Sequence, residues 1–311
     1  MSGDEANTDV TRPRDLIGYG RRVPRVVWPD DAKVAVNFVI NYEEGSEHYE
    51  RLGDRSTDRM AELNWYLPSP HRDFAMEAVY EYGSRAGIWR LLNIFGDYSV
   101  PVTFFATGMA LERNREVAAA IGELGHEPCS HGYRWSEPWH MSREEEAEQI
   151  QRAIESIRET TGTRPVGWYW RYSSTPWTRQ LLVDDGGFLY DSETYNDDLP
   201  YFTDVSGHRH LVIPYTQTYN DTRFAVAEGG FGSPTDFYDY MRRGLDELHR
   251  EGEAGFPKMM TVGLHARLAG QAARANAVRE FIEYALDKGD VWFARRDAIA
   301  NWWIDHSADW S

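Results

Sequence analysis

Five short runs of apolar, β-branched or aromatic residues recur along the chain, and turn residues bound each of them. They span 33–40, 100–107, 210–215, 258–265 and 290–296. Nearly continuous apolar runs are typical of strands that are covered on both faces, as in a parallel sheet. Helical patterns lie between these runs, so the sequence predicts an α/β protein, either a barrel or a doubly wound sheet.

Three helices have clear signals at their ends. Ser142 and Glu145 have the spacing of a capping box, a helix over 233–252 begins with Ser-Pro, and a helix over 274–289 ends on a glycine. No interior linker rich in Pro, Gly or Ser divides the chain. We therefore expect a surface arm over residues 1–30 and a single catalytic domain over residues 31–311.

The charge balance excludes several classes of partner. The chain has 33 basic and 50 acidic residues, a net charge of -17, and no basic stripe. This argues against nucleic acid and anionic membranes as partners. The N-terminus lacks the apolar core of a signal peptide, and no segment has the ~20 apolar residues of a membrane span. We expect a cytoplasmic protein.

The chain has one cysteine, Cys129, which leaves no intrachain disulfide and no Cys-based structural zinc site.

Ionisable side chains gather where the predicted strands end, which is where parallel α/β proteins place their chemistry. An adjacent Glu pair usually lies in a solvated turn, and a His at a strand end is often only a hydrogen-bonding group. Their joint position at successive strand ends favours a common site. The candidates are Glu43, Glu44, Cys129, His131, Arg171, Asp191 and His265. Cys129 lies two residues before His131, so a thiolate nucleophile with a His base is an alternative to a buried, inert thiol.

The order of these motifs resembles the polysaccharide deacetylase (NodB-like) superfamily of carbohydrate esterases. "NYEEG" (41–45), "HGYRW" (131–135), "WRYSSTP" (170–176), "YDSETYNDD" (190–198) and "GLH" (263–265) stand at its five motifs. Longer stretches such as "RDLIGYG", "YEYGSRAG" and "PKMMTVGLHARLAG" resemble the branch of cofactor-independent allantoinases and cyclic imide hydrolases. The resemblance runs from about residue 15 to about 303. It implies a distorted (β/α)7-like barrel and a homo-oligomer, either a tetramer or a dimer.

One departure from this superfamily concerns its zinc ion, which the resemblance places on the second carboxylate of the first motif and both histidines of the second. These positions are Glu44, His131 and Trp135 here. An indole nitrogen only donates hydrogen bonds, and a catalytic zinc normally needs three protein ligands. We therefore expect no required metal, although a divalent metal such as zinc, held by Glu44 and His131 and completed by His126, His140 or another group, stays open.

The lost ligand and the resemblance favour the same reaction, the opening of an allantoin-like hydantoin or a cyclic imide. The ring nitrogen is conjugated to another carbonyl, so it leaves more easily than an amine and a carboxylate base suffices. By the resemblance, Glu43 is the base, His265 protonates the leaving nitrogen, and His131 positions water or substrate. Glu44 would tune the pKa of Glu43. Arg171 would clamp a substrate carbonyl or pair with Asp191 or Glu43.

Aromatic segments are expected to form the substrate wall. The loops 167–178 and 57–74 differ from those of allantoinases and favour a bulkier or less polar ring than allantoin. Two other functions remain: a metal-dependent N-deacetylase, and a non-catalytic ligand-binding barrel. The predicted substrate contacts are Tyr42, Trp135, Trp170, Asp191 and Tyr195.

Overall fold

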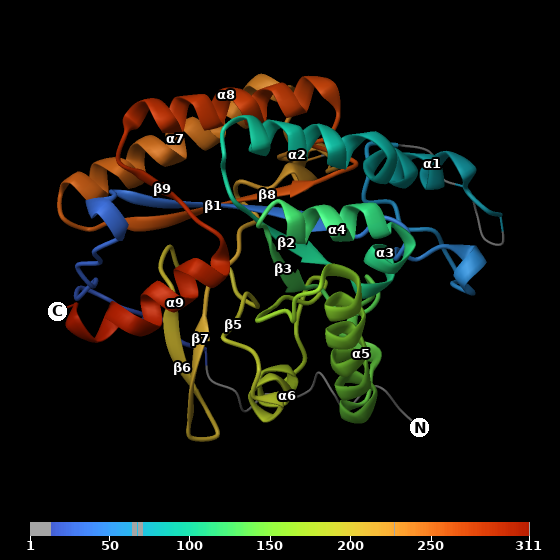
Figure 1. Ribbon diagram of the computed structural model, residues 1–311, viewed down its shortest axis with the longest axis horizontal. Helices are drawn as coiled ribbons and strands as arrows, with labels where there is room; N and C mark the ends of the chain where they lie inside the picture. Colours follow the sequence, from blue (N-terminus) through green and yellow to red (C-terminus); the bar gives the residue numbers. More distant parts are fainter. Residues whose placement is uncertain (1–13, 64–66, 68–70, 227, 311) are drawn as a thin grey trace.

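The structure, a computed structural model, describes residues 14–63, 67, 71–226 and 228–310. Over these residues one curled sheet runs through the molecule in the strand order β6-β7-β5-β4-β3-β2-β1-β8, with β9 also paired to β1 (Figure 1). Its strands are β1 (Val34–Tyr42), β2 (Val102–Ala106), β3 (Glu127–Ser130), β4 (Gly167–Trp168), β5 (Tyr190–Asp191), β6 (Tyr201–Val205), β7 (His208–Val212), β8 (Lys258–His265) and β9 (Val291–Phe293).

The strand pairs are parallel except for β6 and β7, which form an antiparallel hairpin. The free edge of β8 meets irregular chain: Met259 N donates to Asp198 O at 3.0 Å, and Gly263 N donates to Tyr219 O at 2.9 Å. The sheet therefore curls into a distorted half-barrel, which confirms the fold predicted from the sequence.

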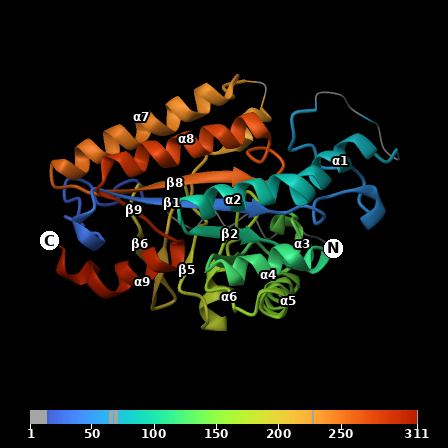
Figure 2. The same ribbon diagram turned by 45° about the horizontal axis from the view of Figure 1, so that its top comes forward.

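Helices cover the outside of this half-barrel (Figures 1 and 2). The helices α1, α2, α7 and α8 lie along β1 and β8, whereas α3, α4, α5 and α6 lie beside the strands from β2 to β5. Their bounds, with that of α9, are α1 (Phe74–Tyr82), α2 (Ile88–Asp97), α3 (Gly108–Arg113), α4 (Arg115–Glu123), α5 (Arg143–Thr161), α6 (Thr178–Asp185), α7 (Pro234–Glu253), α8 (Ala272–Lys288) and α9 (Arg296–His306). No helix of the described chain is long and apolar enough to cross a bilayer.

Strand β1 is buried on both faces, and its alternation decides which side chains reach the inside of the barrel. Phe38 and Tyr42 pack against the outer helices, in the cluster that contains residues of α2, α7 and α8. Ala35 and Val39 instead pack inside the barrel, in the same cluster as Phe105. Asn41 and Glu43, the latter just after the end of the strand, continue this inward series, and both line the pocket described below.

The predicted helix signals are confirmed. Ser142 and Glu145 form a capping box at the start of α5, and Gly289 ends α8 in the left-handed conformation, with φ of +80°. The five predicted runs omit β3, β4, β5 and β6. Strands β4 and β5 have only two residues each, and strands of that length carry no readable period.

The predicted N-terminal arm is only in part a surface element. Residues 1–13 lie outside the described chain, and Leu16 and Ile17 are exposed. Val26 and Trp28, however, are buried, and the Trp28 indole N-H donates to Lys258 O at 3.1 Å. The arm therefore joins the core some residues before the predicted boundary at residue 30.

Candidate active site

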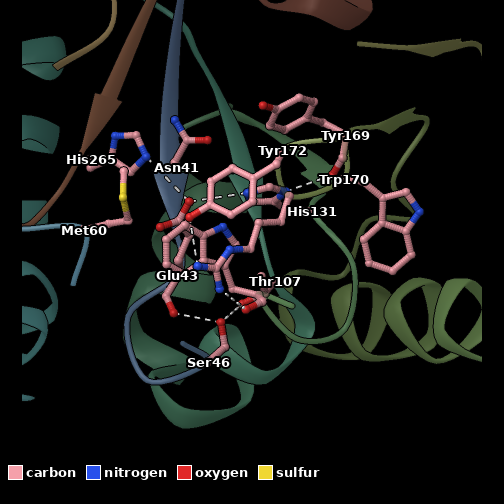
Figure 3. Close-up of polar contacts among 12 residues, drawn as sticks. Asn41, Glu43, Ser46, Met60, Thr107, His131, Tyr169, Trp170, Tyr172 and His265 are labelled. Carbon is pink, nitrogen blue, oxygen red and sulfur yellow. Dashed lines mark hydrogen bonds and ion pairs between the residues drawn. The ribbon is translucent and has the colours of Figure 1, made fainter. Parts of the chain in front are cut away.

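The carboxylate of Glu43 is the centre of the site, at the C-terminal end of β1 and almost fully buried, with 1% exposure. Its Oε1 atom lies 3.3 Å from Nε2 of His131 and 3.5 Å from Nε2 of His265 (Figure 3). Its Oε2 atom lies 2.8 Å from Nη1 of Arg267. One oxygen thus faces two imidazoles, while the other is held by a fixed cation.

Hydrogen bonds fix both imidazole rings. His131 Nδ1 lies 2.8 Å from the carbonyl oxygen of Tyr169, and since a carbonyl only accepts, Nδ1 is the donor. His265 Nδ1 lies 2.7 Å from Oδ1 of Asp221. Both Nε2 atoms are therefore turned toward Glu43, as Figure 3 shows.

Asp221 is a residue that the sequence reasoning missed. It is fully buried, and its Oδ2 atom accepts from the backbone N-H groups of His265 at 2.7 Å and of Ala269 at 2.9 Å. It lies in a short 3-10 turn after Asn220, outside any apolar run. No strand or helix pattern marked this turn, so only its contact with His265 reveals it.

Burial and neighbouring charges determine the protonation states of Glu43 and His265. Burial alone would lower the pKa of His265, but Asp221 and Glu43 raise that pKa to about 9. Burial would raise the pKa of Glu43, but Arg267 and His265 hold it well below its usual range. At neutral pH the site therefore contains an ionised carboxylate beside an imidazolium. A proton acceptor thus lies next to a proton donor, and the catalytic roles of these two residues stay predictions.

Glu44 does not line the pocket. Its Oε2 atom accepts from the backbone N-H of Glu43 at 3.1 Å, and its Oε1 atom accepts from the backbone N-H of Arg267 at 3.2 Å. Gly83 makes room for this carboxylate, because a Cβ at that position would lie 2.5 Å from Glu44 Oε1. Glu44 thus positions the backbone of both residues. Burial, its largest influence, raises its pKa, and the charge of Glu43 raises it further.

The residues present do not fit a zinc ion. Glu44 is turned toward Arg267, and the Trp135 ring lies 3.7 Å from the Arg171 guanidinium carbon. His126 lies at the other end of β3 from His131 and accepts from Val102 N, and His140 is bonded to Trp139. Within the described ranges no three His, Cys, Asp or Glu side chains are grouped to hold a metal ion.

Arg171 lines the pocket but pairs with neither Asp191 nor Glu43. Its guanidinium donates to both Asp58 oxygens, at 2.8 and 2.6 Å, and to Trp135 O at 2.9 Å. It also contacts the Tyr172 hydroxyl at 2.9 Å, and its Nε lies 3.4 Å from Oε1 of Glu137. Arg171 therefore fastens the loop that contains Asp58 over the site, which is a positioning role.

The pocket has an aromatic wall and a polar wall. Trp135 lines it as predicted, as does Met60 from the segment 57–74, of which residues 64–66 and 68–70 lie outside the described chain. The other lining side chains, besides Glu43, His131, Arg171 and His265, are Asn41, Tyr169, Tyr172, Tyr215, Gln217, Asn220 and Thr222.

Four predicted substrate contacts do not line this pocket. Tyr42 points to the outer helices and bonds Ser84 at 2.8 Å, because it is one step out of phase with Glu43. The Trp170 indole donates to Glu146 of α5 at 2.9 Å. Asp191 is fully buried, where it pairs with Arg179 and His210. Tyr195 contacts the pocket only indirectly, through a 2.6 Å bond to the Tyr169 hydroxyl.

The Cys129 thiol is buried, and burial raises its pKa well above the usual value. The carboxylate of Glu127 acts in the same direction. A thiolate is therefore disfavoured at this position, and the geometry does not support the alternative of a cysteine nucleophile.

Comparisons with known proteins identify the family of this chain. A family model described as "Polysaccharide deacetylase" matches residues 71–188. A Schizosaccharomyces pombe protein named "Putative polysaccharide deacetylase" is 39% identical over 93% of this chain and 96% of its own length.

Two crystal structures are similar over nearly the whole chain. The PuuE allantoinase is 45% identical, with a TM-score of 0.90, covering 96% of this chain and 99% of its own. The "probable Polysaccharide deacetylase" of Pseudomonas aeruginosa PAO1 is 47% identical, with a TM-score of 0.89, covering 95% and 99%. The chain therefore belongs to the polysaccharide deacetylase family of hydrolases.

Proposed function

We propose that this chain hydrolyses a C-N bond in a cyclic amide, such as a hydantoin or a cyclic imide, and that it requires no metal ion. The observation that carries the proposal is the single Glu43 oxygen faced by two imidazoles, one of them backed by Asp221. The similarity to the PuuE allantoinase supports the substrate class.

In the proposed reaction a water molecule bound between His131 and Glu43 gives a proton to Glu43 Oε1. The resulting hydroxide attacks the ring carbonyl and forms a tetrahedral intermediate. Nε2 of His265, protonated because its pKa is raised to about 9, gives its proton to the ring nitrogen as the C-N bond breaks. The products are a carboxyl group and an N-H group on the opened chain, so the reaction consumes one water.

Independence from metal rests on the ligand positions. Trp135 cannot bind a metal through its indole, and the Glu44 carboxylate is occupied by two backbone N-H groups. A fixed cation, Arg267, already neutralises the charge of Glu43. The chemistry proposed here therefore uses only side chains of this chain.

The test is a substrate panel with and without a strong chelator: allantoin, succinimide, a dihydropyrimidine and an N-acetylated chitooligomer. We expect turnover of a ring amide that survives chelation. If the acetylated oligomer alone turns over, and the chelator abolishes this, a metal-dependent N-deacetylase replaces our proposal. Several relatives are named deacetylases.

A panel without any turnover, together with tight binding of one of its members, would favour the non-catalytic barrel. The tetrameric or dimeric state and the cytoplasmic location stay predictions. Native mass spectrometry of the purified chain would test the first of them.

A further inference from the structure

We infer that the hydroxyl of Tyr215 is the donor that stabilises the oxyanion of the tetrahedral intermediate. This inference rests on hydrolysis of an amide carbonyl, as proposed above. The attack of water places a negative charge on the carbonyl oxygen, and a site without a metal needs a hydrogen-bond donor there. Tyr215 is one of the side chains that line the pocket with Glu43.

The arginines near the pocket either lie outside its lining or donate to other groups. The Arg267 guanidinium is turned to Glu43 and does not line the pocket. The terminal nitrogens of Arg171, which does line it, donate to Asp58, to Trp135 O and to the Tyr172 hydroxyl. The remaining cation, the imidazolium of His265, faces Glu43 and is assigned to the leaving nitrogen. A neutral side chain is therefore left to supply the hydrogen bond to the oxyanion.

Two amide groups determine where the Tyr215 proton points. Asn41 Nδ2 lies 2.8 Å from the Tyr215 oxygen, and Asn220 Nδ2 lies 3.2 Å from it. Both nitrogens only donate, so the phenol oxygen accepts both hydrogen bonds. Its own O-H is then left to donate, and among the described residues no acceptor for it is found.

Backbone contacts fix the orientation of both amides independently of Tyr215. Asn41 Nδ2 also donates to the carbonyl of Leu264 at 3.2 Å. Asn220 Oδ1 accepts from the backbone N-H of Thr222 at 3.0 Å, and its Nδ2 donates to the carbonyl of Thr216 at 3.3 Å. A flip of either amide would break these bonds, so the assignment of donors is set by the main chain.

The surroundings hold the phenol in place and keep it protonated. Its ring packs against Tyr169 and Phe105, with centroid distances of 4.9 and 5.0 Å. Burial raises the pKa of Tyr215 above its usual value, so it remains a neutral donor at working pH. Gly263 provides the space, because a Cβ there would lie 2.5 Å from the Tyr215 hydroxyl.

Tyr215 is also placed beside the reacting groups by the chain itself. Asn41 lies two residues before Glu43 and is paired in register with His265. Asn220 immediately precedes Asp221. The two amides that orient the phenol therefore belong to the segments that present the base, the acid and the partner of the acid.

The experiment compares Tyr215→Phe with wild type on whichever amide of the substrate panel turns over. Losing one oxyanion donor lowers kcat by roughly 10² to 10³, with a much smaller change in KM. Tyr190→Phe is the matched control: Tyr190 is a buried tyrosine of the same core cluster that lies outside the pocket and donates to Glu127. We expect this control to keep its kcat.

An infrared readout separates this inference from the proposed function. In the Glu43→Gln background, the carbonyl stretch of a bound ¹³C-labelled ring amide or N-acetyl group should shift to lower frequency, and Tyr215→Phe should remove that shift. Wild-type kcat in Tyr215→Phe, or loss of the shift only in Tyr172→Phe, overturns the inference. If wild type acts only on the acetylated oligomer, the proposal of a ring substrate is wrong. The role of Tyr215 is then tested by kcat and by the carbonyl shift on that oligomer. Turnover of no amide overturns both.

Discussion

The contact between Asp221 and His265 makes a quantitative prediction about pH dependence. Asp221→Asn removes a negative charge whose oxygen lies 2.7 Å from His265 Nδ1. For two unit charges whose centres are ~4 Å apart, an effective dielectric constant of ~20 gives an attraction of about 4 kcal/mol. Since ~1.4 kcal/mol corresponds to one pKa unit, the pKa of His265 should fall by roughly 2 to 3 units. Burial, which already lowers this pKa, is then less opposed.

The assay is the pH profile of kcat on a ring amide between pH 5 and 10. In wild type, activity should fall as pH rises through about 9, where His265 loses its proton. In Asp221→Asn this alkaline limb should move to about pH 6 to 7, and a proton NMR titration of the His265 ring should follow it.

Asp191→Asn is the control for this experiment, because Asp191 is equally buried and pairs with Arg179 and His210, away from the pocket. It should lower stability but leave the alkaline limb in place. An alkaline limb that stays near pH 9 in Asp221→Asn would refute the assignment of His265 as the acid whose charge Asp221 maintains.

Three further predictions follow from the same geometry. Glu43→Gln should lower kcat by roughly 10² or more, because an amide cannot take the proton of water; near-normal turnover would remove Glu43 from the mechanism. Trp135→His should not create a tight zinc site, since Glu44 is turned toward Arg267; calorimetric titration giving submicromolar zinc affinity would contradict this. His265 should contribute stability that is fully present below pH 6.5 and lost as pH rises through 9, because its pKa is raised in the folded state. A rise from 6.5 to about 9 corresponds to about 3 kcal/mol, and urea unfolding of wild type and His265→Gln at pH 6 and pH 10 should show a difference that shrinks at the higher pH.

The amino-acid sequence alone determined the parallel sheet, the main helices, and the positions of Glu43, His131 and His265 at strand ends. These features depend on short-range periodicity and on strand ends that share one edge of the sheet, and both can be read from neighbouring residues. The same alternation also explains the misplacement of Tyr42, which is one residue out of phase with Glu43 and faces the helices instead of the pocket.

Only the tertiary structure decided which side chains contact one another in the site. Asp221 comes from a turn without a periodic pattern, yet its carboxylate meets His265, 44 residues later in the chain. Tyr215 reaches Asn41 across 174 residues, and Arg171 reaches Asp58 across 113. Such partners depend on where loops pack over the barrel and on which donors the main chain has already satisfied. Composition and residue spacing do not reveal how the loops pack or which donors are satisfied. The burial and hydrogen bonds of the folded chain do.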